Sequence, residues 1–531
     1  MKKIFCLFVL VNIFIFGVFS QSQNSDDLIG ENSVEASENQ SEIVAAKGGY
    51  AEIPPAKRPL PIDEEKAKKA AEKDESSDSQ ENFRKTIKYG IPSEISSLLD
   101  DLIENEDPRF SEEIYDVFWE TKNTTIQEKI LNYFTKLNDP CLEDFSVELL
   151  NDPYDAKNSL VSSVFKYVQT CKTKVAIPAV ISLIESENEN YFNDAITTLG
   201  EIGGEGEALF LAEYLDREDL SDAQRQSLMR ACGKLHALVT WDKMVEILED
   251  DDENAFVRMY AAESLGLMKV EKSVPVLIEN YNATDPNLRQ YIIKGLANFP
   301  DVVEAKSAIL QGIRDEHWKV RQESIKTAKE IELKEAVPYL IYRVENDSEN
   351  LIKNESISAI ALLNTAEGND FLVSKITNKK TGNEIKKKSV QELLKNGFAG
   401  EKEILDLAKD CVNDDKQKDL RYAVGKELAK YYKSSYDEVC GMFLQSKDTT
   451  TVSLGLDMYK NGKPKSVENY VKTIAEDKKA NSSNRARAKK FLGIEDDDEN
   501  STKKSETKKE NAESINKTDS AQKNISSSDA K

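Results

Sequence analysis

The chain has 531 residues, of which 39% are hydrophobic and 32% are charged, so it is long enough for one large domain or several ordinary ones. Its formal net charge is -24 and its mean hydropathy is -0.55, and the acidic excess is spread along the whole chain. Nucleic acids and anionic membranes both require a cationic surface, so we expect no nucleic acid among its partners.

The first twenty residues (1–20) predict a bacterial secretory signal. Lys2 and Lys3 form a basic start, a largely apolar stretch of 16 residues follows, and the small side chains Val18 and Ser20 occupy the -3 and -1 positions of a cleavage site. That stretch is shorter than the roughly 20 residues a membrane-spanning helix needs. We therefore expect no membrane span in the mature chain and a periplasmic or secreted protein. An uncleaved anchor is the alternative.

Residues 21–82 are rich in Ser, Glu, Asn and Lys and poor in aromatic side chains. Such a segment cannot bury enough apolar surface to offset the entropy lost on ordering, so we predict a disordered acidic linker. Within it, residues 54–61 read PPAKRPLP, a polyproline-like piece that indicates a spacer or a docking motif. Residues 495–531 have the same composition and predict a disordered tail.

Residues 83–494 alternate apolar helical segments with short polar turns and predict an all-α domain. An apolar residue followed by a basic one recurs there every 31 to 35 residues, with an apolar or small residue seven positions later. The basic residues are Arg258, Arg289, Arg321, Lys353, Lys386 and Arg421. Because each unit reads as two antiparallel helices, we predict an α-solenoid of about 12–13 helix pairs with a period of about 32 residues.

Three stretches carry a resemblance to a known family. They are DDENAFVRMYAAESLGLMKVEKSVPVLI (251–278), DPNLRQYIIKGLANF (285–299) and DEHWKVRQESIKTAKEIELKEAVPYLI (315–341). They resemble HEAT repeats, in particular the short bacterial type that also occurs in phycobilisome-lyase proteins. The resemblance is strongest over about 174–364. It implies stacked helix pairs with a curved inner surface lined by the second helices, and it says almost nothing about function.

The repeated basic residue has a predicted structural role. At 100° per residue, positions -1, +3 and +7 from Arg258 lie on one side of the second helix and form its core face. The arginine lies at the rim of that face, where its guanidinium can reach a carboxylate or a free carbonyl in a neighbouring turn. The resemblance implies an Asp–Arg ladder that ties adjacent repeats together. Its candidate members are Arg258, Arg289, Arg321, Lys353, Asp252, Asp285 and Asp315. A cationic ligand channel is the competing hypothesis.

Opposite the core face, positions +1 and +5 form a mostly polar strip with charges of both signs. Its candidate protein-binding residues are Met259, Glu263, Gln290, Lys294, Gln322 and Lys326. If the solenoid holds a partner, this strip is the expected place. An ordinary solvated helix face is the alternative for each residue.

The reactive residue types are sparse. Five cysteines follow the signal, and one pair, Cys141 and Cys171, would face each other in an antiparallel helix hairpin, so we predict an optional disulfide between them. The two histidines, His236 and His317, lack the spacing of a metal site, and no nucleophile motif or phosphate-binding loop occurs. We therefore expect no catalytic, metal-binding or cofactor-binding residues, and no enzyme.

The sequence favours a non-catalytic scaffold of the bacterial cell envelope that binds an unidentified protein partner along the solenoid. A second hypothesis is a lyase-like HEAT enzyme or enzyme accessory. A third is a structural spacer between envelope layers.

Overall fold

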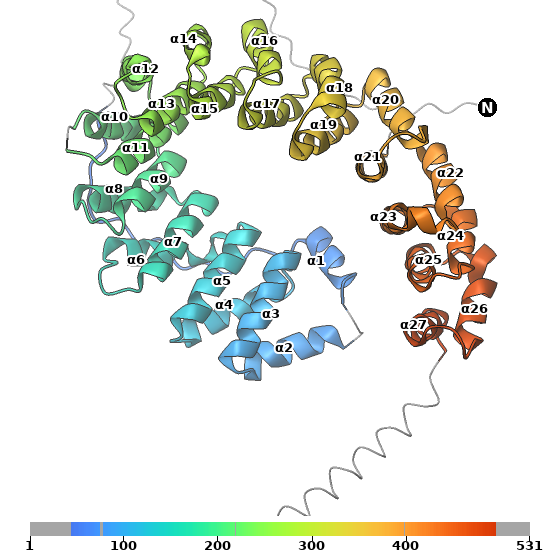
Figure 1. Ribbon diagram of the computed structural model, residues 1–531. Coiled ribbons are helices and arrows are strands. Elements are labelled where there is room, and N and C mark those ends of the chain that lie inside the picture. Colours follow the sequence, from blue (N-terminus) through green and yellow to red (C-terminus); the bar gives the residue numbers. More distant parts are fainter. Residues whose placement is uncertain (1–43, 75–77, 218, 398, 495–531) are drawn as a thin grey trace, which may run out of the picture. The chain divides into compact units, whose positions relative to one another are not determined.

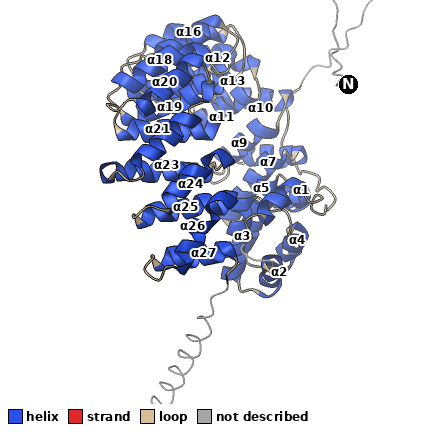
Figure 2. Ribbon diagram, turned by 90° about the vertical axis from the view of Figure 1, so that its right-hand side faces the viewer, coloured by secondary structure: helices blue, strands red, loops and turns tan. Residues whose placement is uncertain are grey.

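The computed structural model describes residues 44–74, 78–217, 219–397 and 399–494. Within these residues the chain forms 27 α-helices and no strand (Figure 2), which confirms the all-α prediction. None of the helices in the described ranges has the length and apolar composition needed to cross a membrane. The predicted signal (1–20), residues 21–43 of the predicted linker and the predicted tail (495–531) lie outside the described residues.

The helices from α2 to α27 form thirteen consecutive pairs (Figure 1), as predicted for an α-solenoid. The first helices are α2 (Ser79–Tyr89), α4 (Ser111–Glu120), α6 (Glu143–Asn151), α8 (Ile177–Glu185), α10 (Glu205–Leu215), α12 (Trp241–Glu249), α14 (Ser273–Glu279), α16 (Val303–Gly312), α18 (Val337–Asn346), α20 (Ala366–Thr377), α22 (Glu401–Cys411), α24 (Asp437–Leu444) and α26 (Glu468–Glu476).

The second helices are α3 (Pro92–Asn105), α5 (Thr124–Leu137), α7 (Asn158–Cys171), α9 (Phe192–Ile202), α11 (Asp222–Lys234), α13 (Ala255–Leu267), α15 (Pro286–Leu296), α17 (Trp318–Glu330), α19 (Asn350–Leu363), α21 (Asn383–Asn396), α23 (Lys418–Lys430), α25 (Thr449–Gly462) and α27 (Ser482–Leu492). Each second helix packs on its own first helix and on the second helices of the neighbouring pairs. The apolar face that repeats along the sequence is thereby buried between pairs.

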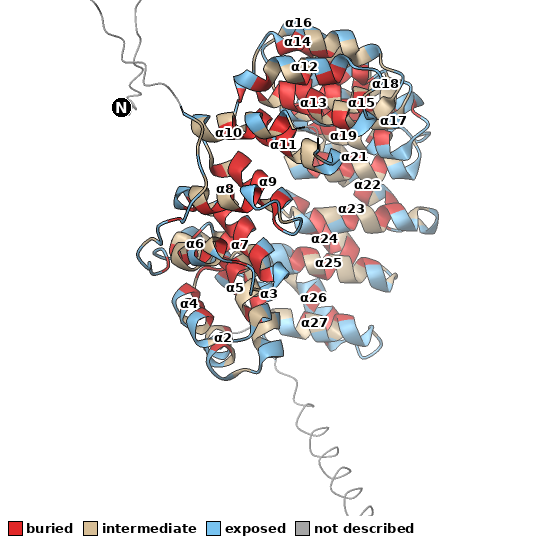
Figure 3. Ribbon diagram, turned by 90° about the vertical axis from the view of Figure 1, so that its left-hand side faces the viewer, coloured by how far each residue is buried: buried red, intermediate tan, exposed pale blue. Residues whose placement is uncertain are grey.

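The second helices of the middle repeats touch through their backbones. A Cβ atom added to Gly266 in α13 would lie 2.4 Å from the Cα atom of Gly295 in α15. One added to Gly233 in α11 would lie 2.9 Å from the Cα atom of Ser264 in α13. Only glycine lets two helix backbones approach this closely. This close packing buries most of α13, which is largely red in Figure 3.

Residues 44–74 and 78–82, the described part of the predicted linker (21–82), differ from the disorder that composition predicted. Residues 44–63, which we call the N-terminal strap, run without regular secondary structure across four first helices, and α1 (Glu64–Ala71) follows. The strap donates backbone hydrogen bonds from Ala46 to Gly206 O (2.9 Å), from Gly49 to Pro178 O (3.1 Å) and from Leu60 to Asp139 Oδ2 (2.8 Å).

The strap is ordered because the solenoid supplies the partners it lacks itself. The side-chain amide of Asn151 accepts a hydrogen bond from Ala51 N (2.8 Å) and donates one to Ala51 O (2.9 Å). Ala51 is fully buried. Within the piece PPAKRPLP, the Arg58 guanidinium lies 4.7 Å from the ring centre of Tyr115 and pairs with Asp116 at 2.7 Å. This piece, for which the sequence indicated a spacer or a docking motif, therefore docks on its own chain.

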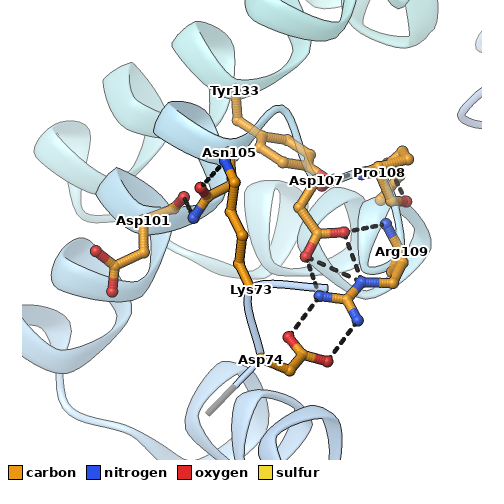
Figure 4. Close-up of polar contacts among 9 residues, drawn as sticks. Lys73, Asp74, Asp101, Asn105, Asp107, Pro108, Arg109 and Tyr133 are labelled. Atoms are coloured by element: carbon orange, nitrogen blue, oxygen red, sulfur yellow. Dashed lines mark hydrogen bonds and ion pairs between the residues drawn. The ribbon is translucent and has the colours of Figure 1, made fainter. Parts of the chain in front are cut away.

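Arg109, just before α4, joins the segment after α1 to the solenoid (Figure 4). Its Nη1 and Nη2 atoms lie 2.8 and 3.0 Å from the two carboxylate oxygens of Asp74, and its Nε atom donates to Asp107 at 2.8 Å. The Tyr133 hydroxyl donates to Asp107 O at 2.7 Å. The Arg109 side chain is 10% exposed, so these bonds are largely shielded from water.

This network predicts a pH-dependent contribution to stability. The hydrogen bonds from Arg109 hold the pKa of the Asp74 carboxyl below its ordinary value. A carboxyl whose pKa is lower in the folded state stabilises the fold above its unfolded pKa of about 3.9, and that contribution is lost as the pH falls through the folded pKa. We expect Asp74→Asn to cost about 1–2 kcal/mol at pH 7 and progressively less below about pH 4.

Urea denaturation of both proteins at pH 7 and pH 3 measures this difference. Asp101→Asn, at an exposed position one turn before Asn105, is the matched control and should leave the stability unchanged at both pH values. An Asp74→Asn deficit that is the same at pH 7 and pH 3 would contradict the assignment of the charge pair.

Candidate protein-binding surface

The predicted ladder exists in the middle repeats, but each arginine pairs with a different carboxylate from the one upstream of it. The Nε and Nη2 atoms of Arg289 both lie 2.8 Å from the carboxylate of Asp315, which precedes α17 in the next pair. In the same way, Arg321 Nη2 lies 2.8 Å from Asp347 Oδ1. Each of these carboxylates lies 26 residues after its arginine, so both bonds tie one helix pair to the next.

The other candidate members do not join the ladder. Arg258 Nε donates to Leu248 O (3.0 Å) at the end of α12, and its Nη1 atom lies 2.9 Å from Asp251, not from Asp252. Asp285 caps α15 by accepting from Asn287 N (2.9 Å). Neither Asp252 nor Lys353 forms an ion pair within the described part of the chain. Arg258 therefore ties together the two helices of its own pair.

The predicted strip is only partly open to solvent. Met259 and Glu263 are buried, 6% and 4% exposed, because the close packing of α11, α13 and α15 covers positions +1 and +5 of α13. This corrects their assignment as partner-binding residues. In the neighbouring helix, Gln290 Nε2 donates to Glu323 (3.1 Å) and Lys294 Nζ lies 2.8 Å from Glu263.

Two predicted residues remain accessible on α17. Gln322 is half-buried, and the Lys326 side chain is 56% exposed. Its ammonium lies 3.6 Å from Glu323 and 3.8 Å from Glu330, distances that leave it free to exchange partners. The strip prediction thus identified the correct layer of helices but only some of the open side chains.

We call a group of eight side chains that α11, α13, α15 and α17 leave at least partly open the second-helix surface. It consists of Ser227, Arg230, Phe256, Tyr260, Tyr291, Lys294, Gln322 and Lys326. Sequence reasoning missed its aromatic residues. The signal was available, since Tyr260 and Tyr291 each follow the repeated arginine by two positions.

Buried charge holds the centre of this surface in place. One carboxylate oxygen of Glu263 lies 2.8 Å from Lys294 Nζ, and the other lies 3.4 Å from Arg230 Nε. Glu263 thereby links α11, α13 and α15. The rings of Tyr260 and Tyr291 meet edge to face with their centres 5.4 Å apart.

Cations lie beside both rings. The Arg230 guanidinium is 5.7 Å from the ring centre of Tyr260, and the Lys294 ammonium is 5.2 Å from that of Tyr291. Burial raises the pKa of Tyr291 to about 12, so its hydroxyl stays protonated at neutral pH. The result is a preformed row of two aromatic rings and two cations.

An open hollow of about 90 Å³ lies beside this row. Its polar lining includes Thr197, Gln226, Ser227, Arg230 and Lys234. Two carboxylates lie nearby, and each is shared by two cations: Glu263 by Lys294 and Arg230, and Glu201 by Lys234 and Lys172. The Arg230 side chain is 46% exposed. The hollow therefore suits a carboxylate that comes from another molecule.

The cysteines form no bridge among the described residues. Cys141 and Cys171 are both free thiols, so the predicted disulfide is absent from the structure. Both lie close to Asp139: the Cys171 thiol donates to Asp139 O at 3.6 Å, and Cys141 N donates to Asp139 Oδ1 at 3.1 Å. No group of three or more His, Cys, Asp or Glu residues within the described ranges is arranged to hold a metal ion.

Comparisons with known proteins give the family. A family model described as Spirochaete HEAT repeat protein matches residues 87–491. No curated protein matches the chain.

Several solved structures are similar to the chain at low identity. Escherichia coli YibA is 16% identical with a TM-score of 0.31, and the match covers 46% of this chain and 91% of that one. The CpcE–CpcF complex of phycocyanin lyase from Nostoc sp. PCC7120 is 16% identical with a TM-score of 0.26, over 47% and 93%. Kap95p, which binds RanGDP, is 10% identical with a TM-score of 0.37, over 79% and 68%. These likenesses concern the fold alone.

Proposed function

Since this chain belongs to the spirochaete HEAT repeat protein family, we propose that it is a non-catalytic scaffold that binds a protein partner on the second-helix surface. The single observation that carries the proposal is the row of Arg230, Tyr260, Tyr291 and Lys294, held in place from below by the buried Glu263. Arginine and tyrosine are the residue types enriched at the centres of protein interfaces.

The chemistry of the row favours a partner segment that carries both an acidic and an apolar side chain. Because ion pairs and ring contacts already fix these side chains, a partner would immobilise few of them on binding, which lowers the entropic cost. Phe256, 61% exposed on the same stripe of α13 as Tyr260, adds apolar area at the edge of the surface. The exposed cations Arg230 and Lys326 would attract an acidic segment.

The bacterial cell envelope is the proposed location. The predicted secretory signal at 1–20 supports it. A structural spacer between envelope layers is the alternative that the binding experiment addresses.

We expect the double variant Phe256→Ala/Tyr260→Ala to bind the partner at least tenfold more weakly, because truncation of an aromatic residue at the centre of an interface costs about 2 kcal/mol or more when it is a hot spot. The immobilised chain captures its partner from envelope extract, mass spectrometry identifies it, and the Kd is then measured with purified components. Lys326→Glu should slow association and reduce its salt dependence, because an exposed charge acts mainly on the encounter rate.

Tyr342→Ala is the matched control. Tyr342 is 55% exposed on the first helix α18 and lies 4.8 Å from the Arg343 guanidinium, so it is an aromatic–arginine pair outside the second-helix surface. It should leave the Kd unchanged. If no protein is retained, or if only removal of the two chain ends abolishes capture, the spacer hypothesis replaces the scaffold.

A further inference from the structure

Two lysines at ladder positions, Lys353 and Lys386, lack the acidic partners that Arg289 and Arg321 have. Lys386 is only 6% exposed, yet its side chain makes no hydrogen bond or ion pair with any described residue. The carboxylate in the following turn, Asp414, instead accepts from Lys416 N (2.9 Å) and Gln417 Nε2 (3.0 Å). A cation shielded from water without a counter-charge is costly to keep, and burial lowers the pKa of Lys386.

Lys386 lies on the wall of an open cleft of about 730 Å³ between the pair α20–α21 and the pair α22–α23. Its ammonium keeps some contact with solvent, and the residue belongs to the lining of this cleft. Lys379 and Lys416 also line the cleft. On the side formed by α22, the cleft is lined by Glu403, Asp406 and Asp410. These three acids are spaced by three and four residues and so share one face of that helix. None of these three lysines, Lys386 included, and none of the three acids forms an ion pair among the described residues.

We propose that this cleft binds a ligand carrying a carboxylate and a cationic group, with the carboxylate paired to Lys386 and the cation paired to the acids of α22. The ladder shows the same chemistry within the chain, where Arg321 holds the fully buried carboxylate of Asp347. A ligand carboxylate would give Lys386 the counter-charge that the fold does not supply. The inference does not rest on the second-helix surface, which lies on other repeats.

Two sources carry this chemistry, a segment of a peptide and a free basic amino acid. Isothermal titration of the full chain with acetyl-lysyl-glutamyl amide and with free lysine tests both. We expect wild type to bind at least one probe and Lys386→Met to bind it at least about tenfold more weakly, the effect of losing one charge-assisted hydrogen bond. Lys353→Met, the corresponding lysine one repeat earlier and outside the cleft lining, should bind like wild type.

The two probes distinguish the two sources of the ligand. Binding of the dipeptide alone indicates a peptide segment, and equal binding of free lysine indicates the amino acid. Circular dichroism checks the fold of Lys386→Met. If it is unfolded, the exposed double variant Asp406→Asn/Asp410→Asn serves instead and should weaken binding at least threefold. No heat from either probe, or unchanged affinity in a folded Lys386→Met or in the double variant, overturns the proposal.

Discussion

Replacing Gly266 with alanine is expected to destabilise the protein by about 3 kcal/mol or more, although it adds a single methyl group. That methyl would lie 2.4 Å from both the Cα and the carbonyl oxygen of Gly295. Both are backbone atoms of α15, so no side-chain rotation can relieve the overlap and α13 and α15 must move apart. Overpacking a tight core typically costs 1–3 kcal/mol, and a backbone–backbone contact lies at the upper end or beyond.

Urea denaturation followed by circular dichroism measures the loss. Gly382→Ala is the control, because Gly382 has a negative φ of -63° and a Cβ atom there would have no neighbour within 4 Å. It caps α21, where exchange of glycine for alanine costs less than about 1 kcal/mol. Equal stability of Gly266→Ala and wild type would show that the second helices are farther apart than described.

Replacing Arg321 with alanine is expected to cost about 3 kcal/mol. The Arg321 side chain is 7% exposed and its partner Asp347 is 0% exposed. Removing one member of a buried ion pair leaves the other charge uncompensated, which costs about 3–5 kcal/mol. Arg343, 3.4 Å from the second oxygen of Asp347, remains and places the effect at the lower end of that range.

Arg258→Ala provides the comparison, since Arg258 holds the same position in its repeat. Its carboxylate partner Asp251 is 93% exposed, so that pair contributes little. The main loss is the hydrogen bond to Leu248 O, about 1 kcal/mol. Thermal or urea denaturation of both variants tests whether Arg321→Ala loses more stability than Arg258→Ala. Equal losses would mean that the ladder position alone, and not the burial of the partner, determines the effect.

The repeating pattern predicted the architecture well. A period of about 32 residues in the apolar and basic positions implies units of two helices, and the structure has thirteen of them within its described residues. This works because a helix period of 3.6 residues puts Val257, Ala261 and Leu265 on one face, and all three are fully buried. The pattern placed Arg289 and Arg321 at the rim of the core face, and the resemblance to HEAT repeats implied that they tie repeats together.

The pattern could not predict which side chains of the second helices stay exposed, because this depends on how closely neighbouring helices approach. Positions +1 and +5 of α13 are polar enough to read as a solvated strip, but the contact between Gly266 and Gly295 brings α15 close and buries Met259 and Glu263. On α13 the open side chains of the second-helix surface, Phe256 and Tyr260, are offset from the predicted strip. Periodicity along one helix gives the direction of each side chain, but not the distance to the next helix.

The sequence alone therefore determined the helical periodicity, the solenoid and the rim position of the arginines, because these depend on spacing within one repeat. Only the tertiary structure decided which carboxylate each arginine meets, since Asp315 and Asp347 lie in the next pair. It also decided that the strap is ordered. A segment of this length without regular secondary structure has no core of its own, and Ala51 is buried where the side-chain amide of Asn151, 100 residues away, binds its backbone.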